Sequence, residues 1–201
     1  MMMTRHRLLP MLLVVLLAGC AARTPALSPT QTERWQQAQE FLAAISKAYG
    51  LSGVTLQVSE GHTGGEIATV KGQAIVIEKA LLDYKPWVVD KVIAHEAAHV
   101  IHGDFHRMRT GWTSRSEAVL ALRGFEVEAD VKVIEILQRV RGYTECKALL
   151  HVLFYKTSQV KALAAGTIKA WPEGHWPPHE EHEMILARFP THHPWTGKCP
   201  T

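Results

Sequence analysis

Apolar residues recur at every third or fourth position in several stretches of the chain. The first such stretch runs over 35–49 and ends at Gly50, which predicts a helix capped by Thr30 or Thr32. The same periodicity returns after Pro86. Further helices are expected over 87–102, over 114–141 with a stop at Gly142, from Thr144 onward, and over 179–189.

Three short runs between the first two helices have the character of β-strands. They cover 54–58, 66–70 and 73–77, are rich in β-branched residues, and are separated by glycines. They predict a small, mostly antiparallel sheet. With the helices, they place the fold in the α+β class, as a single domain over 31–201 with a tail rich in Pro, His and Trp from about residue 171.

The N-terminus has the pattern of a bacterial lipoprotein signal. Arg5 and Arg7 precede an apolar run over 8–18, which is too short to span a bilayer and ends in small residues before Cys20. The pattern predicts a signal peptide over 1–19, a lipidated Cys20 that holds the protein at a membrane, and a tether over 20–30. The alternative is an ordinary signal peptide with a chance cysteine. Ala21, in place of an aspartate, favours the outer membrane, with the protein facing the periplasm.

The composition of the chain argues against one class of function and permits one disulfide. With 22 basic and 19 acidic residues, the net charge of +3 lacks the basic surplus of a dedicated nucleic-acid binder. An oxidising periplasm would permit one disulfide between the two remaining cysteines, Cys146 and Cys199, and two free thiols are the alternative. Histidine is unusually abundant, with 12 in the chain.

An H-E-x-x-H motif lies within the helix expected over 87–102. His95 and His99 are one helical turn apart, so both imidazoles can reach one Zn²⁺ ion at about 2.0–2.1 Å. Glu96 is rotated by roughly 100° around the axis and can reach a water at the metal without being a ligand. The alternative is a surface helix that happens to carry histidines.

A catalytic zinc ion needs a third protein ligand. The elongated H-E-x-x-H-x-x-G-x-x-H pattern fails, because His102 and Phe105 stand where it requires Gly and His. His102 is also about 10.5 Å from His95 along the helix, too far to share the metal easily. We therefore expect His102 to have a supporting, capping or solvent-facing role.

The next helix offers a better ligand. Glu126 and Asp130 are one turn apart on the same face, and the small Ala129 permits close approach of two helices. Glu126 would bind the zinc ion, and Asp130 would accept a hydrogen bond from the far nitrogen of a ligand imidazole. Glu128 points elsewhere and is expected in solvent. The alternative is an ordinary acidic stripe on a long helix.

The two motifs together resemble the HtpX-type family of zinc metallopeptidases. The matching segments are H-E-A-A-H-V-I-H-G-D at 95–104 and E-V-E-A-D at 126–130, within a resemblance over roughly 54–140. The family includes membrane-embedded peptidases and soluble periplasmic lipoproteins. The resemblance implies a compact gluzincin fold, Glu126 as the third zinc ligand, and a peptide substrate extended along an edge strand. We expect that edge at 73–77.

Two features depart from the family pattern. Only 26 residues separate His99 from Glu126, which leaves little room for an insertion over the substrate. The His-Pro segment and following Arg, usual beyond the ligand helix, have only approximate matches in the tail. One tail histidine is expected to stabilise the oxyanion or to cover the zinc ion, with a plain polar tail as the alternative. The candidates are His175, His179 and His182.

The predicted function is a zinc-dependent endopeptidase of the cell envelope, with one Zn²⁺ per chain, that hydrolyses unfolded or misassembled proteins. Glu96 would accept a proton from the zinc-activated water and pass it to the leaving amine. Two alternatives use the same ligands: a non-enzymatic zinc-stabilised lipoprotein acting as a chaperone or assembly factor, and a hydrolase of cell-wall peptide or amide bonds. A scaffold has no need of an acid at position 96, which favours the peptidase.

Overall fold

The computed structural model describes residues 25–61, 67–107, 112–167, 171–192 and 199. The expected signal peptide over 1–19, the lipidated Cys20 and the first part of the tether lie outside the described residues. Among the described residues, no helix combines the length and the apolar character that crossing a bilayer requires.

Helix α1 (Pro29–Tyr49) begins earlier than the sequence predicts. Its cap is Ser28. The Ser28 hydroxyl accepts a hydrogen bond from the backbone N–H of Gln31, and the Gln31 side-chain oxygen accepts one from the backbone N–H of Ser28. The expected caps Thr30 and Thr32 were wrong, because Pro29 suits the first helical position and moves the start of the helix upstream. The helix ends at Gly50 (φ 68°), as the sequence predicts.

The sheet contains β1 (Thr55–Ser59), β2 (Ala68–Lys71) and β3 (Ala74–Glu78) in the order β1-β3-β2. Strands β2 and β3 form an antiparallel hairpin, whereas β1 pairs parallel with β3, so the sheet is mixed rather than mostly antiparallel. The expectation that 73–77 forms an edge was wrong. Ile75, Val76 and Ile77 are all buried, and such a continuous apolar run suits a central strand.

The helical part follows the sequence pattern closely, and the α+β class is confirmed. Three helices have ends that the sequence predicts: α2 (Pro86–His102) ends before Gly103, α4 (Arg115–Arg141) ends before Gly142, and α5 (Glu145–Ala164) begins after its cap Thr144. The remaining elements are η1 (Lys79–Asp83), α3 (Asp104–Arg107), α6 (Pro178–Ala187) and η2 (Pro190–His192).

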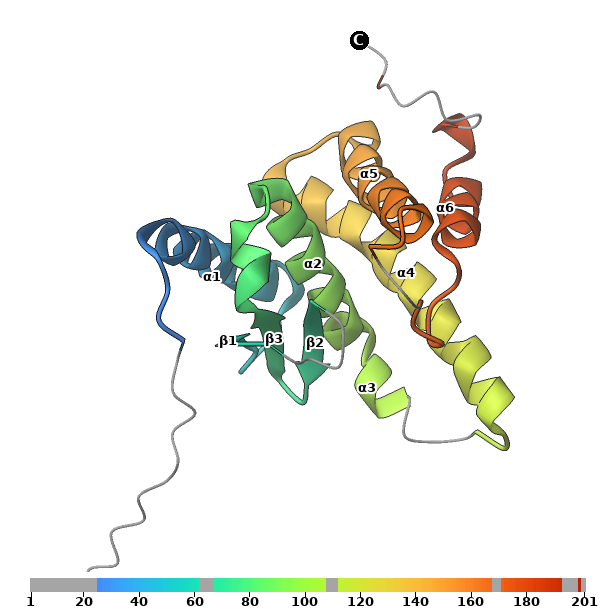
Figure 1. Ribbon diagram of the computed structural model, residues 1–201, viewed down its shortest axis with the longest axis horizontal. Coiled ribbons are helices and arrows are strands. Elements are labelled where there is room, and N and C mark those ends of the chain that lie inside the picture. The colour runs from blue at the N-terminus through green and yellow to red at the C-terminus, as the bar shows by residue number, and fades with distance from the viewer. Residues whose placement is uncertain (1–24, 62–66, 108–111, 168–170, 193–198, 200–201) are drawn as a thin grey trace, which may run out of the picture.

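Helix α2 lies at the centre of the molecule and carries much of the core. It packs against α1 and the sheet on one side and against α4 and α5 on the other (Figure 1). Small residues allow these close contacts, because Ala94, Ala97 and Ala98 of α2 and Ala129 of α4 are completely buried. A helix held from several sides is a rigid platform for side chains that must converge.

The C-terminal segment is tied to the start of α5. Cys146 and Cys199 form a disulfide across 53 residues, with their Cα atoms 5.6 Å apart. Beside it, His192 Nε2 lies 3.1 Å from Glu145 Oε1. Loop-closure entropy makes a disulfide between residues so far apart in sequence stabilising, and the disulfide holds Cys199 against the start of α5.

Candidate metal centre

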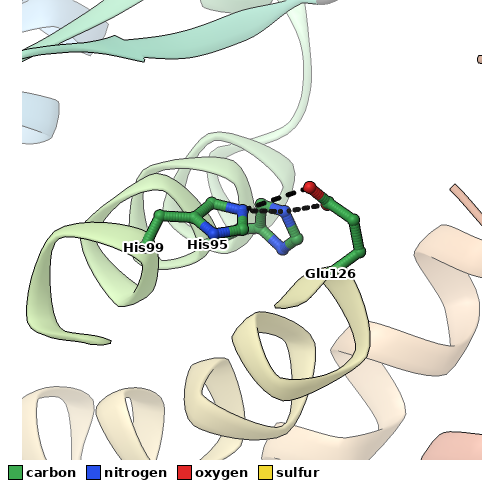
Figure 2. Close-up of side chains that lie close together, drawn as sticks. All are labelled: His95, His99 and Glu126. Carbon is green, nitrogen blue, oxygen red and sulfur yellow. Dashed lines mark hydrogen bonds and ion pairs between the residues drawn. The ribbon is translucent and has the colours of Figure 1, made fainter. Parts of the chain in front are cut away.

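Three side chains from two helices converge at the contact between α2 and α4 (Figure 2). His95 and His99 project from α2, and Glu126 projects from α4 toward both rings. His95 Nε2 lies 2.9 Å from Glu126 Oε2, the two Nε2 atoms are 3.2 Å apart, and His99 Nε2 lies 3.5 Å from Glu126 Oε1. All three potential ligand atoms lie within 4.8 Å of one another.

A buried carboxylate orients each imidazole from behind. Asp130 Oδ1 lies 2.7 Å from His95 Nδ1, and Asp104 Oδ2 lies 3.0 Å from His99 Nδ1. A carboxylate at Nδ1 accepts the proton of that nitrogen, so that in the neutral ring Nε2 is the atom with a lone pair for a metal, which is the arrangement of metal-binding histidines. The site therefore has two imidazole nitrogens and one carboxylate oriented toward a common point.

Asp104 was missed by the sequence analysis. Helix α2 ends at Gly103, whose left-handed backbone (φ 67°) turns the chain so that the next residue lies beneath the helix end. Asp104 is completely buried there, and Arg107 Nη1 donates a hydrogen bond of 2.9 Å to its second oxygen. The sequence did contain a feature that could have identified Asp104. It is an acid that directly follows a C-capping glycine and lies five residues after His99.

Two buried lysines beside Asp130 were also missed. Lys91 Nζ lies 2.8 Å from Asp130 Oδ1, and Lys156 Nζ lies 2.7 Å from Asp130 Oδ2. Lys91 is one turn before His95 among buried valines. A single cationic residue on an otherwise apolar helix face is the sequence feature that could have identified it. Lys156 lies on α5, distant in sequence from both motifs, and carried no comparable signal.

The other sequence candidates occupy different surroundings. Of the three tail histidines, only His175 contacts the ligand set in the described part of the chain, with Nδ1 3.3 Å from Glu126 Oε2. His179 is paired with Glu180 and His182 with Glu183, away from the three ligands. His102 Nδ1 lies 3.8 Å from Asp104 Oδ2, behind the site.

Two acidic residues complete the description of these helices. Glu96 is partly buried on α2, and its negative charge acts on the neighbouring His99 imidazole. Glu128 is on the outer face of α4, about half exposed, and pairs with Arg188. Glu96 is thus the acid positioned beside the ligands, and Glu128 belongs to the surface.

The carboxylates draw protons onto the ligands when no cation is bound. Burial alone would lower the pKa of His99, but Asp104 and Glu126 raise it to about 10. Burial would raise the pKa of Glu126, but hydrogen bonds from His95 and His99 hold it well below its usual value. The site therefore already favours positive charge at its centre.

Zinc affinity is consequently expected to rise with pH. The raised pKa of His99 predicts that, without a bound metal, this imidazole holds protons on both ring nitrogens at neutral pH, and the Nε2 proton must leave before that atom can bind metal. Calorimetric titration in buffers of different ionisation enthalpy should show proton release on zinc binding at pH 7. The apparent affinity should increase steadily between pH 6 and 9. A pH-independent affinity without proton release would contradict this account.

The donor set fits zinc by its chemistry. Two imidazoles and one carboxylate are the ligands that a catalytic Zn²⁺ ion takes, and both imidazoles have the supporting carboxylates such sites require. No protein-family model, curated protein or solved structure matches this chain. The geometry of the described residues and the sequence motifs therefore carry the functional argument.

Proposed function

We propose that this protein is a zinc-dependent endopeptidase of the HtpX type. The observation that carries the proposal is the convergence of His95, His99 and Glu126, together with Glu96, an acid that directly follows His95 in sequence and acts electrostatically on His99. Its substrate class would be unfolded or misassembled proteins. Its location would be the periplasmic side of the bacterial cell envelope, at the outer membrane, through a lipidated Cys20.

Each residue of the site would have its own role in peptide hydrolysis. His95, His99 and Glu126 would hold the zinc ion, whose chemistry is to polarise the scissile carbonyl and to acidify a water molecule. Glu96 would accept the proton of the attacking water and deliver it to the leaving amine. Asp130 and Asp104 would keep both imidazoles in the tautomer that presents Nε2.

The sheet offers a path for an extended substrate. Strand β2 is an edge strand and contacts α2, the helix that carries the motif. A peptide could pair with its open side in the manner of strand addition. In this proposal β2 takes the place of the 73–77 segment, which is central in the sheet.

Metal removal tests the proposal directly. The full mature chain should contain close to one zinc ion per molecule and should cleave an unfolded substrate such as casein. A chelator should abolish cleavage, and added Zn²⁺ should restore it. A purified protein that binds no zinc, or cleavage that is insensitive to the chelator, would refute the proposed function.

A zinc-stabilised, non-enzymatic envelope protein is the second candidate. The specific observation in its favour is His175, whose Nδ1 lies 3.3 Å from Glu126 Oε2, although its ligand atoms are not within 4.8 Å of those of all three residues His95, His99 and Glu126. Structural zinc sites are closed by four protein ligands, whereas catalytic sites keep one position open. The two functions therefore differ in the role of His175.

Replacing His175 with alanine separates these candidates. In the peptidase, His175 covers the site, so His175→Ala should keep zinc and raise kcat/KM for casein several-fold. In the structural protein, His175→Ala should weaken zinc binding by about 10-fold or more and produce no cleavage. His179→Ala is the matched control, because His179 is exposed on α6 and pairs with Glu180. It should leave both measurements unchanged.

A further inference from the structure

A network of buried charges extends from the metal centre to the C-terminal helix. Lys91 and Lys156 are each 2% exposed, and Asp130 and Glu181 are completely buried. Lys156 Nζ lies between two carboxylates, 2.7 Å from Asp130 Oδ2 and 2.8 Å from Glu181 Oε2. One ammonium group thereby joins α4 to α6, and Asp130 continues the connection to His95 of α2.

Stability alone gives a weak reason for this arrangement. Removing four charges from water is costly, and apolar residues of similar volume often replace buried ion pairs without loss. Buried ionic groups are better attested as devices that fix one geometry among several. The geometry fixed here is the position of α6 relative to the helix pair that carries the proposed ligands.

Helix α6 in turn positions a segment next to the metal centre. Residues 171–177, which we name the strap, lead directly into α6 and carry His175. Trp171 Nε1 donates a hydrogen bond of 2.7 Å to the Trp176 carbonyl oxygen, and Arg123 Nε of α4 donates one of 3.1 Å to the Glu173 carbonyl oxygen. The strap is therefore anchored to α4 at one side and to α6 at its end.

The two lysines are not equivalent. Burial would lower the pKa of Lys156, but Asp130 and Glu181 outweigh burial and raise it above its usual value. Burial lowers the pKa of Lys91, and the neighbouring Lys156 lowers it further. Lys156 is thus the firmly charged member, and it is the one that contacts α6.

We propose that Lys156 is a positioning residue that links zinc binding to the placement of α6 and the strap. Through Asp130 it holds the His95 imidazole, and through Glu181 it holds α6. The proposal rests on the zinc site of the proposed function. It implies that a change on α6, at a residue the structure does not place in contact with any zinc ligand, alters the metal centre.

Glu181→Gln tests this link, with Glu180→Gln as the matched control. Glu181 is buried against Lys156, whereas its neighbour Glu180 is exposed. Each variant and the wild type would be measured as the full mature chain for zinc affinity by chelator competition, for the visible spectrum of the Co²⁺-substituted site, and for amide exchange in 178–187. Urea unfolding would show that each variant is folded.

Glu181→Gln should weaken zinc binding at least five-fold, change the Co²⁺ spectrum, and accelerate exchange in α6 at least ten-fold. Glu180→Gln should change none of these. Repeating the pair in a His175→Ala background should give the same difference, which excludes an effect carried by His175 alone. Should Glu181→Gln not fold, the Lys156→Gln/Glu181→Gln double variant removes both charges together and should show the same weakened zinc binding.

Wild-type zinc affinity and an unchanged Co²⁺ spectrum in Glu181→Gln would overturn the link, even if the protein is an active zinc peptidase. Equal effects of Glu181→Gln and Glu180→Gln would also overturn it. A wild-type protein that binds neither zinc nor cobalt would instead refute the proposed function, and the link would fall with it. The two failures are therefore distinguishable.

Discussion

Replacing Glu96 with glutamine is expected to abolish peptide hydrolysis while zinc remains bound. The amide keeps the size of the side chain but cannot accept the proton of the attacking water. General base catalysis contributes about 10²–10⁴-fold to such reactions, so kcat for casein should fall by at least that factor. The proposed ligands His95, His99 and Glu126 are untouched, so zinc stoichiometry and thermal stability should stay close to those of the wild type.

Glu40→Gln provides the matched control for this substitution. Glu40 lies on the exposed face of α1, away from the metal centre, and the same change there should leave kcat unaltered. Cleavage by Glu96→Gln at the wild-type rate would remove Glu96 from the mechanism.

Local spacing made much of the site predictable. The four-residue intervals between His95 and His99 and between Glu126 and Asp130 place each pair on one helix face, and the structure brings these faces together. Asp104 was not found, because its role depends on the turn at Gly103 rather than on helical periodicity. Spacing within a helix is readable from sequence, and the direction of the chain after a helix is much less so.

Contacts between distant segments account for the remaining differences. The helix ends at Gly50, Gly103 and Gly142 follow from the local need for a left-handed residue. Strand order is a property of three segments at once, so the central position of β3 could not be read from β3 alone. Lys156 illustrates the same limit, because its carboxylate partners come from α4 and α6.

Replacing Asp130 with asparagine is expected to destabilise the fold and the metal centre together. The amide would keep the shape of the side chain but leave Lys91 and Lys156 without their shared carboxylate. Removing one partner of a buried ionic group costs about 3–5 kcal/mol, which urea unfolding at pH 7 would measure. Zinc affinity should fall by about 10–100-fold, because His95 loses its orienting carboxylate.

The acid limb of the stability curve gives an independent check on Asp130. Burial would raise the pKa of Asp130, but Lys156, Lys91 and His95 hold it well below its usual value. A carboxylate with a depressed folded pKa contributes stability above its unfolded pKa of about 3.9, and the contribution disappears as pH falls through the folded value. Wild-type stability should therefore fall more steeply than that of Asp130→Asn at acid pH, so that the two converge.

Glu128→Gln on the same helix is the control for this experiment. Glu128 is about half exposed and pairs with Arg188 at the surface, where an ion pair contributes about 0–1 kcal/mol. The control should therefore keep nearly all of the unfolding free energy and the zinc affinity. The opposite outcome is that Asp130→Asn loses no more unfolding free energy and zinc affinity than Glu128→Gln does. That result would contradict the role of Asp130 as the stabilising partner of Lys91 and Lys156 and as the carboxylate that orients His95.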